Sequence, residues 1–147
     1  MKWPAAVPTL AVLILAFAMP AAAEEALEFS ADATSDGARF ALADMAAVSR
    51  NNALDFWFAE ADFNGDDRLD VLAFAMDSYF CGSGGCSPRL YVASKKGWKE
   101  INFYGLGRPA NWSLLDATDH GYRRVVYREG DTDYLFGFTG EYYDDMD

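Results

Sequence analysis

Residues 69–77, LDVLAFAMD, are apolar at odd and even positions alike. Alternate side chains of a strand point to opposite faces of its sheet, so a strand of this composition needs cover on both faces. Turn-forming residues bound the run, with ADFNGDDR before it and CGSGGC shortly after it. The sequence therefore predicts a buried central strand between two surface turns.

A helix is expected ahead of the strands, over residues 35–52. Ser35 or Asp36 can cap its first turn, and Ala41 and Met45 recur at helical spacing. Beyond it the apolar period changes to two, which indicates strands at 54–62, 69–77, 88–95, 97–104, 111–117, 121–129 and 132–138. We expect an α+β domain, with one N-terminal helix followed by a mostly antiparallel sheet of about six to seven strands.

The two ends of the chain are expected to lie outside this domain. Residues 10–19 are apolar and uncharged, Pro20 follows, and a run of three alanines offers a cleavage site before Glu24. The run is shorter than the roughly 20 residues that span a bilayer, so 1–23 reads as a secretory signal peptide of a bacterial periplasmic or secreted protein. Residues 24–34 are expected to be a flexible lead-in, 35–139 the single domain and 140–147 an acidic tail.

The net charge of the chain limits the classes of partner that it is expected to bind. Residues 1–23 contain one of the 12 basic residues and none of the 23 acidic ones, so the remainder carries a net charge of −12. Nucleic acids and anionic membrane surfaces are recognised through basic patches. The composition argues against both and favours cations or a basic protein partner.

The acidic turn has the spacing of a calcium loop. Ca²⁺ takes six to eight oxygen ligands, and a tight loop can supply them from alternate residues, numbered here from Asp62 as position 1. The candidate ligands at positions 1, 3, 5, 7 (through its carbonyl) and 9 are Asp62, Asn64, Asp66, Arg68 and Asp70. Position 12 is Ala73 where an EF-hand has a bidentate Glu, so this is not an EF-hand.

Two alternatives stay open for this turn: a metal-free hairpin turn and a catalytic carboxylate pair. The stretch DFNGDDRLD resembles the DxNGDGxxD loop of FG-GAP and VCBS β-propeller repeats. That resemblance implies a structural calcium ion between two strands. The sequence departs from the pattern at Asp67, where the family has Gly and where the backbone often needs a left-handed conformation.

Cys81 and Cys86 are the only cysteines. An exported protein with an even cysteine count favours a disulfide. A metal site would need further soft ligands, and a redox C-x-x-C motif has two intervening residues where this chain has GSGG. We expect a disulfide that shapes an exposed loop.

The order of strand, acidic turn, apolar strand, CGSGGC and GW resembles a group of small bacterial exported proteins that share a DLNGDGRPE…CGSGGC core. The resemblance covers about residues 58–101. It implies an architecture and no established activity.

A possible ligand surface contains Trp57, Trp98, Trp112, Arg124 and Arg128. The alternative is that the tryptophans fill the core and that the arginines pair with acids across the sheet. The leading function is a non-catalytic binding module of inhibitor type that docks to a basic protein. A carbohydrate- or peptidoglycan-binding domain is the alternative, and an enzyme is third, since no complete catalytic constellation is visible.

Overall fold

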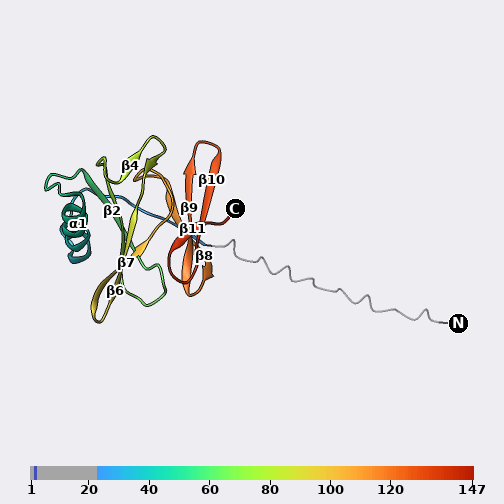
Figure 1. The fold of residues 1–147 in the computed structure, drawn as a ribbon. Helices are drawn as coiled ribbons and strands as arrows, with labels where there is room; N and C mark the ends of the chain where they lie inside the picture. Colours follow the sequence, from blue (N-terminus) through green and yellow to red (C-terminus); the bar gives the residue numbers. More distant parts are fainter. Residues whose placement is uncertain (1, 3–22) are drawn as a thin grey trace.

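The computed structural model describes residues 2 and 23–147, and nearly all of the expected signal peptide lies outside them. One helix packs on a four-stranded antiparallel sheet, and the other face of that sheet packs on a five-stranded antiparallel sheet (Figure 1). The α+β prediction is confirmed, with β-structure dominant. Within the described residues, no helix combines the length and the apolar character that crossing a membrane requires.

Helix α1 (Asp36–Ser49) begins where the sequence predicts a cap. The Ser35 hydroxyl accepts a hydrogen bond from the Ala38 N–H at 3.1 Å, which satisfies one of the free donors of the first turn. Arg50 ends the helix in the left-handed conformation, with φ at 57°. The face that carries Ala41 and Met45 is fully buried against the four-stranded sheet. The apolar residues whose spacing predicts the helix are therefore the residues that pack on the sheet.

The four-stranded sheet has the order β2-β3-β6-β7 and consists of β2 (Phe56–Ala61), β3 (Asp70–Ala75), β6 (Arg89–Ser94) and β7 (Gly97–Asn102). All six residues of β3 are buried. Val71 and Ala73 pack with the helix, whereas Leu72 and Phe74 pack with the second sheet. The prediction of a central strand covered on both faces is confirmed.

The five-stranded sheet has the order β1-β8-β9-β10-β11 and consists of β1 (Glu24–Ala26), β8 (Trp112–Asp119), β9 (Tyr122–Glu129), β10 (Thr132–Phe138) and β11 (Tyr143–Asp145). Aromatic rings fill the core between the sheets. The Trp112 ring stacks on Tyr127 at a centroid distance of 4.6 Å and lies 5.5 Å from Phe74 of the facing sheet. The two sheets are therefore held together mainly by apolar burial.

The expected count of six to seven strands is too low. The strands form two main sheets, where the sequence predicts one. The described residues form eleven strands, and the four that the sequence pattern missed are β1, β11 and the short hairpin β4 (Cys81–Gly82) and β5 (Gly85–Cys86). Each has only two or three residues, so none is long enough to show an alternating period. Residues 24–34 and 140–147, expected outside the domain, contribute the two edge strands of the second sheet.

Candidate functional site

The acidic loop, residues 62–70, folds around its first side chain. The Asp62 carboxylate accepts backbone N–H bonds from Asn64, Gly65, Asp66 and Asp67, at 2.8–3.3 Å. Asp67 has a φ of 62°, a left-handed conformation that Gly adopts more readily than Asp. The predicted left-handed backbone at this position is therefore present, with Asp in the strained conformation.

Asp70, expected as the ninth-position ligand, turns into the protein. Its side chain is 0% exposed, and its two carboxylate oxygens accept N–H bonds from Phe63 and Ala93, each at 2.9 Å. Burial raises the pKa of this carboxyl to about 6, and the neighbouring Asp62 and Asp66 charges add to the rise. Asp70 therefore joins the acidic loop to β6 in the structure.

Within residues 2 and 23–147, no three side chains among His, Cys, Asp and Glu lie together as a metal-binding group. Calcium ligation by Asp62, Asn64, Asp66 and the Arg68 carbonyl stays a prediction. The Asp62 oxygens already receive amide hydrogens, which are a second means of balancing their charge.

The disulfide between Cys81 and Cys86 is present, as predicted. It links directly opposite residues of the β4–β5 hairpin. Cys86 exchanges two backbone hydrogen bonds with Gly107, at 2.8 and 3.0 Å, so the hairpin is fixed to the loop that precedes β8. A Cβ at Gly85 would lie 2.9 Å from the Gly107 carbonyl oxygen, so the close approach of these backbones requires glycine there.

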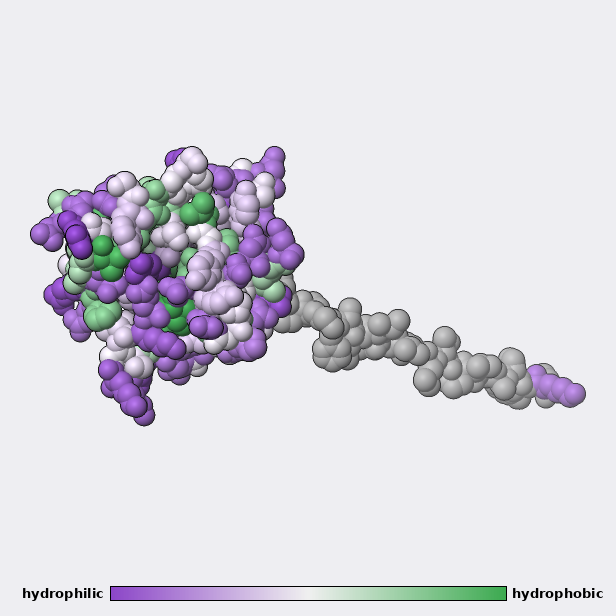
Figure 2. All heavy atoms as spheres, viewed as in Figure 1, coloured by the Kyte–Doolittle hydropathy of each residue, from purple (hydrophilic) through white to green (hydrophobic). Residues whose placement is uncertain are grey.

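The exposed apolar side chains gather around this hairpin. Eight large hydrophobic side chains are exposed in the described part of the chain, and five of them line three hollows beside the disulfide. We call these five the disulfide face: Met76, Tyr79, Tyr104, Leu106 and Tyr134. The hollows measure about 250, 400 and 300 Å³ and adjoin through Tyr104 and the hairpin tip. The face of the molecule seen in Figure 2 is mostly hydrophilic, with small apolar patches.

The tryptophans of the expected ligand surface do not come together. Trp112 is 1% exposed and belongs to the core, so the prediction that it lies on a ligand surface is wrong. Strand alternation shows which residues share a face of the sheet, but it does not show whether another sheet covers that face. Trp57 and Trp98 lie on β2 and β7, the two opposite edges of the four-stranded sheet. Both are partly buried, and Trp98 stacks on Phe40 of the helix.

The arginines of the expected surface are already paired. Arg124 donates two hydrogen bonds to Asp119, at 2.8 and 3.1 Å, and this hydrogen bonding lowers the pKa of that carboxyl. Arg128 pairs with Glu24 of β1 and with Asp133 of β10. These contacts connect β9 to its neighbours β8 and β10 and, across β8, to the edge strand β1, so the arginines act as cross-strand partners within the five-stranded sheet.

Comparison of the chain with protein-family models, with curated proteins and with solved structures finds no match. The sequence pattern predicts the disulfide, but it does not predict that exposed aromatic side chains gather around it. Tyr79 was available as a signal because it stands two residues before Cys81, whereas Tyr104 and Leu106 reach the hairpin only through the fold.

Proposed function

We propose that the protein is an exported, non-catalytic binding module that docks a basic protein partner through the disulfide face. The observation that carries the proposal is the gathering of five of the eight exposed large hydrophobic side chains at one hairpin. Contiguous exposed apolar surface of this kind marks interaction sites. Tyrosine is also among the residues that contribute most to binding energy at interfaces.

The charge around the face supports a basic partner. Asp77, Glu129 and Asp145 line the same hollows as the exposed rings, and the chain beyond residue 23 has a net charge of −12. Opposite charge on a partner would speed association and favour the correct orientation. Arg108 also lines one hollow, so the partner should present an acidic group or a carbonyl there.

The rigidity of the hairpin supports binding as well. The disulfide and the paired hydrogen bonds of Cys86 with Gly107 fix the loop before any partner arrives. A surface that is already ordered loses less conformational entropy on association. The exposed rings of Tyr79 and Tyr104 pack edge-on against Phe80 and Tyr142, which limits their motion too.

A pull-down from periplasmic extract tests the proposal. The wild-type protein should retain a basic protein in a salt-dependent manner, and a Tyr79→Ser/Leu106→Ser variant should lose it. Leu69→Ser is the matched control, because Leu69 is 58% exposed but lies in the acidic loop at the other end of β3. Equal retention by the double variant and the wild type would overturn the proposal.

A glycan is the second candidate ligand, for one specific reason. The hollow of about 250 Å³ between Tyr79 and Tyr104 also contains Arg89 and Asn102, so aromatic faces flank hydrogen-bonding groups. Cosedimentation with purified peptidoglycan sacculi separates the two classes. Sedimentation that Tyr104→Ser abolishes, without retention of a basic protein, would favour the glycan.

A further inference from the structure

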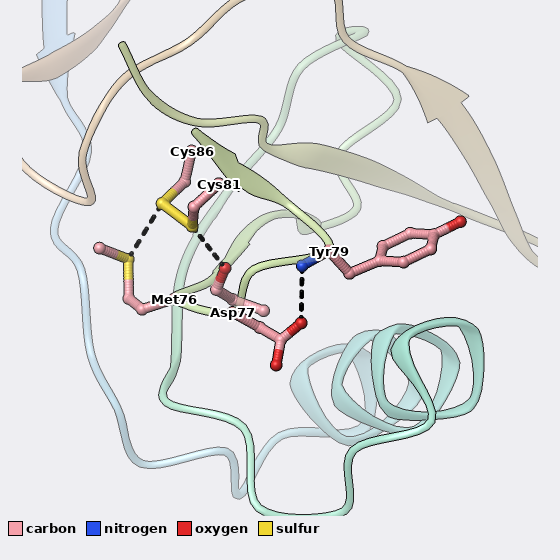
Figure 3. Close-up of a disulfide and its surroundings, with 6 residues drawn as sticks. Met76, Asp77, Tyr79, Cys81 and Cys86 are labelled. Carbon is pink, nitrogen blue, oxygen red and sulfur yellow. Dashed lines mark hydrogen bonds between the residues drawn. A yellow bond between two sulfur atoms is a disulfide. The ribbon is translucent and has the colours of Figure 1, made fainter. Parts of the chain in front are cut away.

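Three sulfur atoms lie together at the end of β3. The Met76 Sδ is 3.6 Å from the Cys86 Sγ, which is bonded to the Cys81 Sγ, and Figure 3 shows the Met76 thioether pointing at the disulfide. All three residues line one hollow of about 400 Å³. Met76 is 38% exposed and Cys86 is 3% exposed, so a small solute reaches the cluster through this hollow, past Met76.

The fold would keep the sulfurs together after the disulfide is reduced. Cys81 and Cys86 are opposite partners in the β4–β5 ladder, so their side chains project from adjacent strands at one level. Contacts independent of the disulfide fix the hairpin: Cys86 pairs with Gly107, and the Ser87 N–H donates to the Phe80 carbonyl at 2.8 Å. Reduction would leave two thiols beside the thioether.

We propose that the reduced protein binds one Cu(I) ion through the Cys81 and Cys86 thiolates and the Met76 thioether. Thiolate and thioether sulfur are soft ligands, which select Cu(I) over the hard cations that prefer oxygen. With metal–sulfur bonds of about 2.3 Å, three sulfurs around one ion lie about 4 Å apart. The separation of 3.6 Å between Met76 and Cys86 is already close to that spacing.

The reaction has two steps that balance. A dithiol reductant gives two electrons and two protons to the disulfide, which becomes two thiols while the reductant becomes a disulfide. Cu(I) then displaces the two thiol protons and accepts electron pairs from three sulfurs. The site is separate from the calcium prediction, because the acidic loop lies at the opposite end of β3.

The test is a competition titration without oxygen. Protein reduced by a dithiol and freed of it is titrated with Cu(I) in the presence of the chromophoric chelator bicinchoninate. The wild type should take one Cu(I) per chain, and native mass spectrometry gives the same ratio. Met76→Leu should weaken binding by about 10-fold or more, since even groups behind the ligands commonly contribute that much.

Met146→Leu is the matched control, because Met146 is 39% exposed against 38% for Met76 and lines a different hollow with His120. Its affinity for Cu(I) should equal that of the wild type. Circular dichroism of each reduced variant shows whether it is folded. Wild-type affinity in a folded Met76→Leu variant would overturn the three-sulfur site. Equal affinity in Cys81→Ser/Cys86→Ser would overturn binding at the hairpin altogether.

Discussion

Strand β3 begins at the acidic loop, 62–70, and ends at the disulfide loop, 76–87, and the two loops are stiffened by different means. In the acidic loop one carboxylate, Asp62, collects four backbone N–H groups, and a second, Asp70, is buried beneath it. In the disulfide loop a covalent bond and two hydrogen bonds to Gly107 hold the hairpin. The first loop should respond to protonation and the second to reduction.

The largest effect is expected at Asp70. Asp70→Ala removes the acceptor of the Phe63 and Ala93 N–H groups, and leaving two such donors without a partner costs about 3 kcal/mol of unfolding free energy. Urea denaturation measures the loss. Asp66→Ala, an exposed member of the same loop, is the control and should change stability much less. Equal losses in the two variants would show that Asp70 has no special structural role.

Removal of the disulfide should have a smaller effect. Cys81 and Cys86 are five residues apart, and closing so short a loop stabilises a protein by about 2 kcal/mol in the chain-entropy description. We expect Cys81→Ser/Cys86→Ser to lose that amount in urea denaturation, with faster amide hydrogen exchange confined to the disulfide loop. A loss greater than that of Asp70→Ala would reverse the ranking of the two loops.

A smaller effect is expected from pH, which should change the stability contributed by the acidic loop through Asp70. Burial raises the pKa of Asp70 to about 6, so the folded protein holds this proton more tightly than the unfolded chain does. Its contribution to stability is full below the unfolded pKa and is lost as the pH rises through about 6. The stability difference between wild type and Asp70→Ala should grow by on the order of 1 kcal/mol from about pH 7 to about pH 4.

Groups whose pKa is lowered, such as Glu24, Asp77 and Asp119, act in the opposite direction but are present in both proteins, so they cancel in that difference. Urea denaturation at several pH values gives the comparison. A difference that stays constant with pH would mean that the Asp70 carboxyl titrates alike in the folded and unfolded chains.

Addition of calcium should have the smallest effect on the stability of the protein. If Asp62, Asn64 and Asp66 hold the ion as predicted, several millimolar calcium stabilises the wild type by about 1 kcal/mol or less, as expected for a weak extracellular site. The melting temperature should rise slightly in the wild type and stay unchanged in Asp66→Ala. No rise in the wild type would show that the backbone N–H groups alone balance the Asp62 charge.

The sequence predicts those parts of the fold in which local patterns are long. The run of consecutive apolar residues at 71–76 identifies β3, and Ser35 with the period of Ala41 and Met45 identifies the helix. The strands of two or three residues carry too few side chains to show a period. The division into two sheets is decided by long-range packing, such as Phe74 against Trp112.

The candidate sites show the same division between local and distant information. The disulfide follows from cysteine count and spacing. The inward orientation of the Asp70 side chain could not be predicted in this way. Asp70 accepts a hydrogen bond from the Ala93 N–H, which belongs to a strand 23 residues away. Likewise, Leu106 joins the disulfide face only because the loop before β8 crosses the hairpin, and Tyr134 only because β10 lines the same hollow.

The edge strand β1 has a consequence for the order in which the chain can fold. The helix and the four-stranded sheet use residues 36–102, a continuous stretch that can pair as it is synthesised. Strand β1 instead waits for β8, and its Glu24 pairs with Arg128, 104 residues later. Such distant pairing is slow because a long loop must close first. Until β8 has been synthesised, the residues of β1 stay unpaired and accessible to enzymes and chaperones that act on a nascent chain.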